Sequence, residues 1–115
     1  ITVENPGDVS CGCRIVFRAL GEVTNPELMD AATGEYVRLN TVMTAGEEIR
    51  AYTHFAGKRV VRIQSGEEVS VFSLLDTGST FLQLSPGKTT LRYDAAAGKE
   101  LLEVSLYYRP QYLGV

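Results

Sequence analysis

Short runs of β-branched and aromatic residues recur along the whole chain, and they restrict its fold more than any other feature. Gly, Pro, Asn and Asp separate these runs at intervals of about 8–12 residues, the spacing of turns between short antiparallel strands. Apolar residues seldom recur at the three- and four-residue spacing of an amphipathic helix. The sequence therefore predicts an all-β protein.

About ten short strands account for these runs. They are predicted at residues 1–4, 14–20, 28–30, 35–42, 48–53, 59–64, 69–75, 81–84, 89–94 and 101–108. The one helical candidate is a single turn at residues 94–98. This series favours an antiparallel β-sandwich of the jelly-roll or galectin-like type.

Alternation along each strand predicts which side chains enter the core. Successive side chains of a strand point to opposite faces, so Ile15 and Phe17 are expected inside. In the strand at 59–64, the same rule leads us to expect Val61 and Ile63 as the inward pair.

Length and charge bound the function. At 115 residues the chain is expected to form one domain, residues 1–115, with a core of its own. The net charge of −3 provides no basic excess for phosphates, so no nucleic-acid partner is expected. No window approaches the roughly 20 apolar residues that span a bilayer, so no membrane insertion is expected. Because the sequence starts with Ile1 in a strand, we expect the C-terminal domain of a longer chain.

The two cysteines, Cys11 and Cys13, are predicted to be free thiols. Their spacing places them on one face of a strand, where a disulfide between them would be strained. A zinc site would need a second cysteine pair, and His54 is the only histidine. We therefore expect no metal and no other cofactor.

One motif resembles a catalytic loop. Two leucines followed by Asp76-Thr77-Gly78-Ser79 give the local pattern of an aspartic protease, in which two such aspartates share a proton. That architecture places the motif early, because a flap hairpin must follow it, whereas here it lies in the last part of the chain. We expect Asp76 and Ser79 to be structural and to bond the turn backbone. Since nothing places a nucleophile beside His54 either, the chain is predicted not to be an enzyme.

A stripe of polar and aromatic side chains is the candidate partner-binding face. Simple alternation projects it from one side of neighbouring strands, and it consists of Tyr36, Arg38, Arg50, Tyr52 and His54. Tyrosine and arginine are enriched in binding hot spots, although a merely solvated sheet face has the same composition. Carbohydrate binding is the alternative, since sugars stack on aromatic faces such as those of Tyr36, Tyr52, Phe55, Tyr107 and Tyr108.

A series of turns and strand residues runs through the whole chain. It consists of Asn5-Pro6-Gly7-Asp8, Asn25-Pro26, Asp30, Thr33-Gly34-Glu35, Leu39, Ala45-Gly46-Glu47, Ile49, Leu75-Asp76, Ser79, Phe81, Leu84, Pro86-Gly87 and the ending Tyr108-Arg109-Pro110-Gln111-Tyr112-Leu113-Gly114-Val115. This series resembles a known family, the C-terminal domain of siphophage distal tail proteins. The ending is the most specific part. Two positions depart from the family pattern, Thr53-His54 in place of an Asp-Thr pair and Lys88 in place of an Asn.

The resemblance implies a non-enzymatic structural module of a phage or prophage tail tip. It implies a galectin-like sandwich that contributes to the distal tail hub and docks neighbouring baseplate or receptor-binding proteins, with host-surface glycans as the alternative partner. The full-length chain is expected to form a homo-oligomeric ring through another domain, while the isolated domain is a monomer. The expected location is the virion tail, after assembly in the bacterial cytoplasm.

Overall fold

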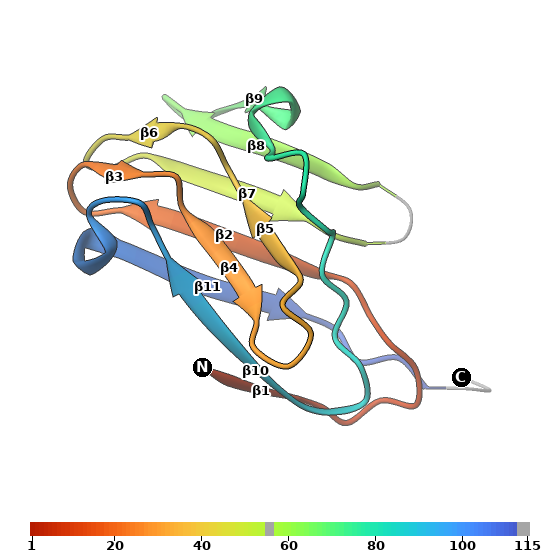
Figure 1. Cartoon of the computed structure of the whole chain (residues 1–115). Coiled ribbons are helices and arrows are strands. Elements are labelled where there is room, and N and C mark those ends of the chain that lie inside the picture. The colour runs from red at the N-terminus through yellow and green to blue at the C-terminus, as the bar shows by residue number, and fades with distance from the viewer. Residues whose placement is uncertain (55–56, 113–115) are drawn as a thin grey trace.

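Two antiparallel sheets packed face to face form the body of the protein, as a computed structural model of residues 1–54 and 57–112 shows (Figure 1). The smaller sheet has the order β1-β10-β4-β5, with bounds Thr2–Asn5, Gly87–Asp94, Glu27–Asp30 and Tyr36–Arg38. The larger sheet has the order β11-β2-β7-β8-β9, with bounds Leu102–Tyr108, Cys13–Ala19, Glu48–Tyr52, Arg59–Gln64 and Glu67–Ser70.

Three short elements complete the fold. A two-stranded ribbon pairs β3, Val23–Thr24, with β6, Val42–Met43. Two 3-10 helices, η1 (Phe72–Leu74) and η2 (Lys99–Leu101), lead out of β9 and into β11. With eleven strands, all in antiparallel pairs among the described residues, the predicted all-β antiparallel architecture is confirmed.

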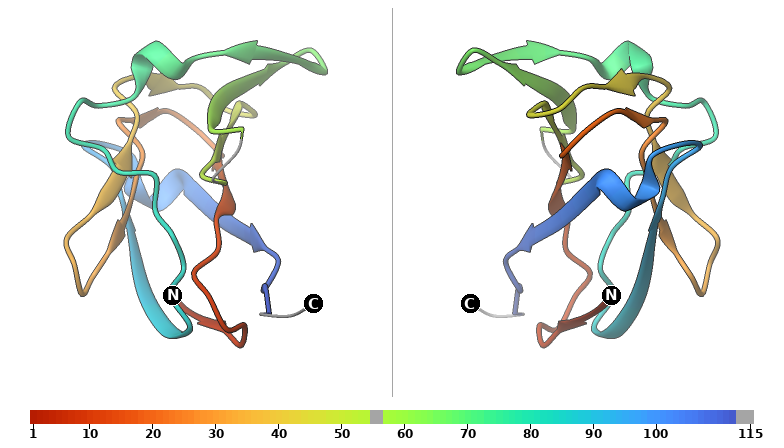
Figure 2. Two further views of the ribbon diagram at one scale, coloured as in Figure 1. Left: turned by 90° about the vertical axis from the view of Figure 1, so that its right-hand side faces the viewer. Right: turned by 90° about the vertical axis from the view of Figure 1, so that its left-hand side faces the viewer.

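The core lies between the two sheets, whose separation is visible from both ends of the molecule (Figure 2). Phe17 and Ile49 fill it from the larger sheet, and Leu28 and Val37 from the smaller one, all fully or almost fully buried. Burial of this kind contributes roughly 1.5–3 kcal/mol for each large apolar side chain. The alternation predicted for the strand at 14–20 is confirmed, since Ile15 and Phe17 are both fully buried.

The inward pair predicted for β8 is wrong. Ala51, which is inward on β7, lies opposite Val60, and Ile49 lies opposite Arg62. Val61 and Ile63 therefore face outward, opposite Arg50 and Glu48. Two adjacent valines give no alternation from which to choose the register, and Arg62 is tolerated inside because its Nε lies 3.2 Å from a Glu47 carboxylate oxygen.

Four predicted segments also differ from the structure. The strand predicted at 69–75 ends at Ser70, because Leu74 and Leu75 bond back to Val71 and Phe72 in the 3-10 turn. The segment at 81–84 is not a named strand, and one bridge from Leu84 to Cys11 holds it. The strand predicted at 35–42 is divided between β5 and β6. The single helical turn lies in η2 rather than at 94–98.

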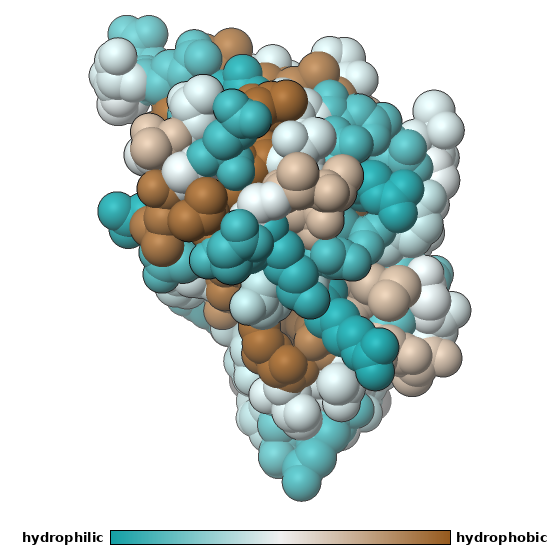
Figure 3. All heavy atoms as spheres, turned by 60° about the vertical axis from the view of Figure 1, so that its left-hand side comes forward, coloured by the Kyte–Doolittle hydropathy of each residue, from teal (hydrophilic) through white to brown (hydrophobic). Residues whose placement is uncertain are grey.

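Some hydrophobic side chains remain outside the core at the end of the molecule that carries the β2–β3 loop and η2. Leu20 is 54% exposed and Leu101 is 36% exposed, and the N–H of Leu20 donates to the carbonyl of Leu101. Figure 3 brings this end forward and shows hydrophobic patches among hydrophilic side chains. We refer to these two residues as the Leu20–Leu101 patch. Among the described residues, no helix is long and apolar enough to cross a membrane.

Candidate partner-binding surfaces

The predicted partner-binding stripe does not form one surface. Tyr36 and Arg38 lie on β5 in the smaller sheet, whereas Arg50 and Tyr52 lie on β7 in the larger sheet. All four point away from the core, so the two pairs are on opposite outer faces of the sandwich. The prediction of a single stripe is wrong, because alternation assigns a side chain to a face but does not say which sheet its strand joins.

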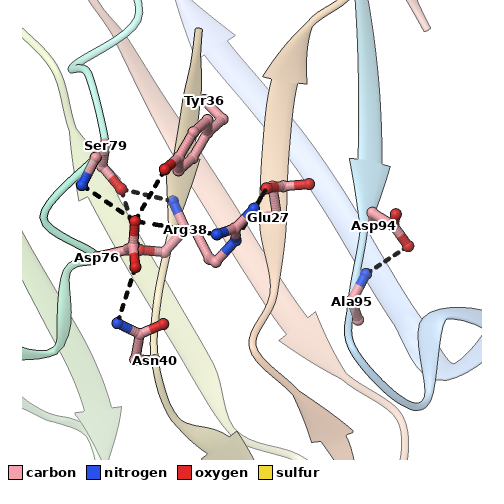
Figure 4. Close-up of polar contacts among 9 residues, drawn as sticks. Glu27, Tyr36, Arg38, Asn40, Asp76, Ser79, Asp94 and Ala95 are labelled. Atoms are coloured by element: carbon pink, nitrogen blue, oxygen red, sulfur yellow. Dashed lines mark hydrogen bonds and ion pairs between the residues drawn. The ribbon is translucent and has the colours of Figure 1, made fainter. Parts of the chain in front are cut away.

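On the outer face of the smaller sheet, Asp76 is surrounded by hydrogen-bond donors (Figure 4). Its carboxylate accepts from the Tyr36 hydroxyl at 2.9 Å, from Nδ2 of Asn40 at 3.2 Å and from the N–H of Gly78 at 3.1 Å. These donors, Asn40 foremost, lower the pKa of the Asp76 carboxyl. The hydrogen bond between Tyr36 and Asp76 is also the main reason why the pKa of Tyr36 is raised. The Asp76 carboxylate is thus engaged by hydrogen bonds from its own turn and from residues in and just after β5.

The Asp76–Ser79 turn covers the outer edge of β5. The N–H of Asp76 donates to the carbonyl of Arg38 at 2.9 Å, and that of Thr80 donates to the carbonyl of Tyr36 at 2.7 Å. The hydroxyl of Ser79 accepts from the Arg38 N–H at 3.0 Å. An edge strand would otherwise present unpaired main-chain groups. In this structure Asp76 and Ser79 bond the turn and its neighbouring strand.

Arg38 is held in the same cluster. Its Nη2 lies 2.5 Å from Oε1 of Glu27, and its Nη1 lies 4.0 Å from Oδ2 of Asp76. Its guanidinium also lies 4.5 Å from the centroid of the Tyr36 ring. Because both Tyr36 and Arg38 are engaged by this network, they are poorly placed to reorient toward a partner.

The outer face of the larger sheet carries a row of alternating tyrosines and arginines. The strand registers place Tyr107, Arg14, Tyr52 and Arg59 side by side on β11, β2, β7 and β8. The Arg14 guanidinium lies 4.3 Å from the centroid of the Tyr107 ring, and that of Arg59 lies 4.2 Å from the Tyr52 ring. Both distances are within the range of a cation–π interaction. Of this row only Tyr52 was predicted as part of a partner-binding face.

An open groove of about 470 Å³ lies at the end of this row. Its walls include Arg14, Tyr52, His54, Tyr107, Tyr108 and Arg109. His54 is exposed at the end of β7, so the structure brings His54 and Tyr52 together in this groove. We call it the Tyr107–Arg14 groove. Phe55, the other aromatic residue considered for sugar binding, lies outside the described residues.

Gly12 shapes the floor of the groove. A Cβ atom at this position would collide with the backbone of His54, so the chain passes His54 closely only because residue 12 is glycine. Beneath the floor, the hydroxyl of the buried Thr53 accepts from the Cys13 N–H at 2.8 Å. Cys11 and Cys13 are free thiols, as predicted, and the structure shows that both are buried.

The larger sheet has two edge strands, β11 and β9, and a free edge lies along β11. In an antiparallel pair, every second residue of a strand forms its backbone hydrogen bonds to the partner strand. Leu101 is such a residue, because its carbonyl accepts from the N–H of Leu20, so the odd-numbered residues of β11 bond to β2. The main-chain groups of Val104, Leu106 and Tyr108 then point away from the sheet. Within residues 1–54 and 57–112, no backbone hydrogen bond joins these outward groups to another segment.

The comparison with protein families decides which kind of protein has this fold. Residues 6–112 match the family described as siphovirus-type tail component, C-terminal domain. The chain belongs to this family. No curated protein and no solved structure matches the chain.

Membership in the tail component family agrees with the resemblance drawn from the turns. Apart from Asn5 at the start of the first turn, the matched residues include the turns quoted for that resemblance, and they extend into the ending after β11. The last three residues of that ending, 113–115, lie outside the described residues. Among the residues that the structure describes, no group of three or more His, Cys, Asp or Glu is placed to hold a metal ion.

Proposed function

We propose that this tail component domain is a non-enzymatic structural module of the distal tail hub. It docks a neighbouring tail or baseplate protein at the tip of a phage tail. Its family supports a place in the tail. The finer role rests on one observation, the free edge of β11, which begins at the Leu20–Leu101 patch.

A free strand edge with an adjacent apolar patch suits a protein partner. Outward N–H and C=O groups pair readily with an added strand, and alternate side chains of that strand then supply specificity. Val104 and Leu106 are only half-buried, so an added strand would complete their burial. Exposed apolar residues rimmed by polar ones mark protein interfaces. The partner in this proposal is an extended segment of a neighbouring tail protein.

Substitution of Val104 tests the docking edge. Val104→Pro removes an outward N–H without removing a hydrogen bond to β2, and proline is tolerated at such edge positions. Val104→Ala is the matched control, because it loses side-chain volume but keeps the N–H. Phage carrying Val104→Pro should yield far fewer complete tails than phage carrying Val104→Ala, because the alanine variant loses some apolar contact but keeps the N–H that an added strand needs.

Folding of both variants is checked first by near-ultraviolet circular dichroism of the purified domain. A second pair of variants, Leu20→Asp and Leu101→Asp, tests the patch beside the edge. Complete tails from phage carrying folded Val104→Pro, and equally from phage carrying either aspartate variant, would place the docking surface elsewhere.

In this proposal the full-length chain forms a ring through contacts outside these residues. The domain alone is then a monomer, and the ring joins the virion tail after assembly in the bacterial cytoplasm. The free edge of one sheet is a small surface, well below the 2,000 Å² or more that obligate interfaces commonly bury.

A second candidate function, binding of host-surface glycans, is favoured by the Tyr107–Arg14 groove. Tyr107 is 51% exposed at its mouth, which leaves aromatic surface available for stacking. The groove lies at the C-terminal end of β11, whereas the Leu20–Leu101 patch lies at its start. Variants of the two surfaces therefore test the two functions separately.

A further inference from the structure

We propose that the Tyr107–Arg14 groove binds an anionic sugar, a saccharide unit that carries a phosphate or a carboxylate. This inference rests on the second candidate function, glycan binding, and does not depend on docking at the β11 edge. It names the chemical class of the ligand.

The charge of the groove is the first reason. The domain has a net charge of −3, yet the described residues that line the groove include Arg14, Arg109 and His54 and no aspartate or glutamate. A concave surface with one sign of charge concentrates ligands of the opposite sign. The groove is thus a local cationic site on an acidic protein.

The state of its arginines is the second reason. On the same outer face, Arg50 lies 2.6 Å from Glu48 and Arg59 lies 3.4 Å from Glu68. Within the part of the chain that the structure describes, Arg14 and Arg109 have no carboxylate partner. Nε of Arg14 is also buried without a hydrogen-bond acceptor. A guanidinium with unmet donors is well matched to the oxygens of a phosphate or carboxylate.

The aromatic surface of the groove is the third reason. Tyr107 is held in place by Arg14, whose guanidinium lies 4.3 Å from the ring centroid. Tyr108 is fixed from the other side, because its hydroxyl donates to the Glu4 carbonyl. Rings fixed in this way lose little entropy when a sugar ring stacks on them. The groove volume of about 470 Å³ lies within the range of roughly 300–1,000 Å³ found for small-molecule sites.

An acidic peptide would satisfy the arginines but not the aromatic surface. Aspartate and glutamate side chains have no ring face to place against Tyr107. A neutral sugar would stack, and its hydroxyl oxygens would accept from Arg14, but it would bring no negative charge to pair with the guanidinium. An anionic sugar is the ligand class that satisfies both features at once.

Titration of the ¹⁵N-labelled protein tests this proposal. The probes are glucose 1-phosphate, glucuronic acid, methyl glucoside, inorganic phosphate and a hexa-aspartate peptide, each followed by chemical-shift changes. Glucose 1-phosphate and glucuronic acid should both shift Gly12, His54 and Tyr107. Methyl glucoside, phosphate and the peptide should each bind at least about tenfold more weakly. Added salt should weaken the binding of the two anionic sugars, because it screens their charge.

Matched variants locate the site. Arg14→Gln and Tyr107→Ala should each lower the affinity for glucose 1-phosphate by about tenfold, the factor that corresponds to about 1.4 kcal/mol of binding free energy. Arg92→Gln is the control, since Arg92 is an exposed arginine on the smaller sheet. Each variant is titrated only if its spectrum keeps the chemical-shift dispersion of the wild type, which shows that it is folded. Arg109→Gln replaces a variant that is not folded.

Several results would overturn the proposal. Absence of binding by both anionic sugars would do so, and so would equally tight binding of methyl glucoside or of phosphate alone. Equal binding of hexa-aspartate would identify a site for acidic peptides instead. Unchanged affinity in Arg14→Gln and Tyr107→Ala would place the ligand elsewhere.

Discussion

The hydroxyl of Tyr36 donates a 2.9 Å hydrogen bond to Oδ2 of Asp76 and so joins β5 to the turn that covers its edge. A Cβ atom on residue 78 would collide with this hydroxyl, so a larger residue there would displace the Tyr36 side chain from its bond to Asp76. Asp76, Gly78 and Ser79 each have a structural reason for their identity. The sequence pattern of an aspartic protease loop is thus accounted for by the packing of an edge strand.

The variant Asp76→Asn should lower stability in a pH-dependent way. The donors around Asp76, Asn40 first among them, lower its pKa in the folded state. Its carboxylate therefore stabilises the fold fully above the unfolded pKa of about 3.9, and this contribution is lost as pH falls through the lower folded pKa. Urea midpoints of wild type and variant should differ at pH 7 and converge toward pH 3.

Glu103→Gln, an exposed change on β11, is the control and should not show this convergence. The same purified proteins should show no cleavage of a peptide library at acidic pH. Cleavage by the wild type that disappears in Asp76→Asn would falsify the structural assignment of this residue.

Replacement of Thr53 should separate shape from hydrogen bonding beneath the groove. Thr53 is 0% exposed, and its hydroxyl accepts from the Cys13 N–H and donates to the Cys13 carbonyl. Thr53→Val keeps the shape but leaves a buried N–H without this acceptor, which should cost about 1–3 kcal/mol of unfolding free energy. Thr53→Ser keeps the hydroxyl and should cost about 1 kcal/mol for the lost methyl. Equal loss in both variants, measured by urea denaturation, would contradict the role of the hydroxyl.

The two thiols should be almost inert in the folded protein. Burial raises the pKa of the Cys13 thiol to about 11 and also raises that of Cys11. The thiolate is the reactive form, and at pH 8 only about one thiol in a thousand with a pKa of 11 is ionised. Reaction with a disulfide reagent at pH 8 should be at least about 100-fold slower in buffer than in urea. Comparable rates would show that this region opens frequently.

Arg50 and Tyr52 remain predicted partner-binding residues on the outer face of the larger sheet. If a tail protein covers them, Arg50→Ala and Tyr52→Ala should reduce the yield of complete tails by about tenfold, because such residues dominate interfaces. Arg92→Ala on the opposite face should have no effect. Tails that assemble and bind cells normally with both alanine variants would leave this face solvated and without a partner.

The oligomeric state of the 115-residue chain tests where the ring contacts lie. Sedimentation at micromolar concentration should show a monomer, since the two free edges and the small apolar patch are not large enough for an obligate interface. A stable hexamer of this chain alone would place the ring contacts within these residues.

Strand positions were largely predictable, because hydrophobic alternation and turn residues are local signals. The strand at 59–64 was predicted with the bounds of β8, and β2 and β7 were predicted to within one residue at each end. The segment at 81–84 was not, since its residues look extended but only Leu84 bridges to another segment, at Cys11. A single sequence does not say whether an extended segment finds a partner strand.

The candidate site was less predictable for the same reason. Arg14 and Tyr107 become neighbours because β2 pairs with β11, and this pairing leaves no mark in the local sequence. Alternation shows that each points outward, which was the only available signal. The register that aligns them with Tyr52 depends on packing across the whole sheet.

The pairing of β2 with β11 also bears on how the protein is made. The second strand of the chain, β2, pairs with the last one, β11, so that Cys13 lies opposite Tyr108 and Ala19 lies opposite Leu102. A ribosome that adds about 5–20 residues per second must therefore reach Tyr108 before the larger sheet can be completed. Until then the nascent chain has an open edge at β2 with Ile15 and Phe17 on it, and such distant pairings also slow folding. The nascent domain therefore has this open edge until β11 is available to pair with β2.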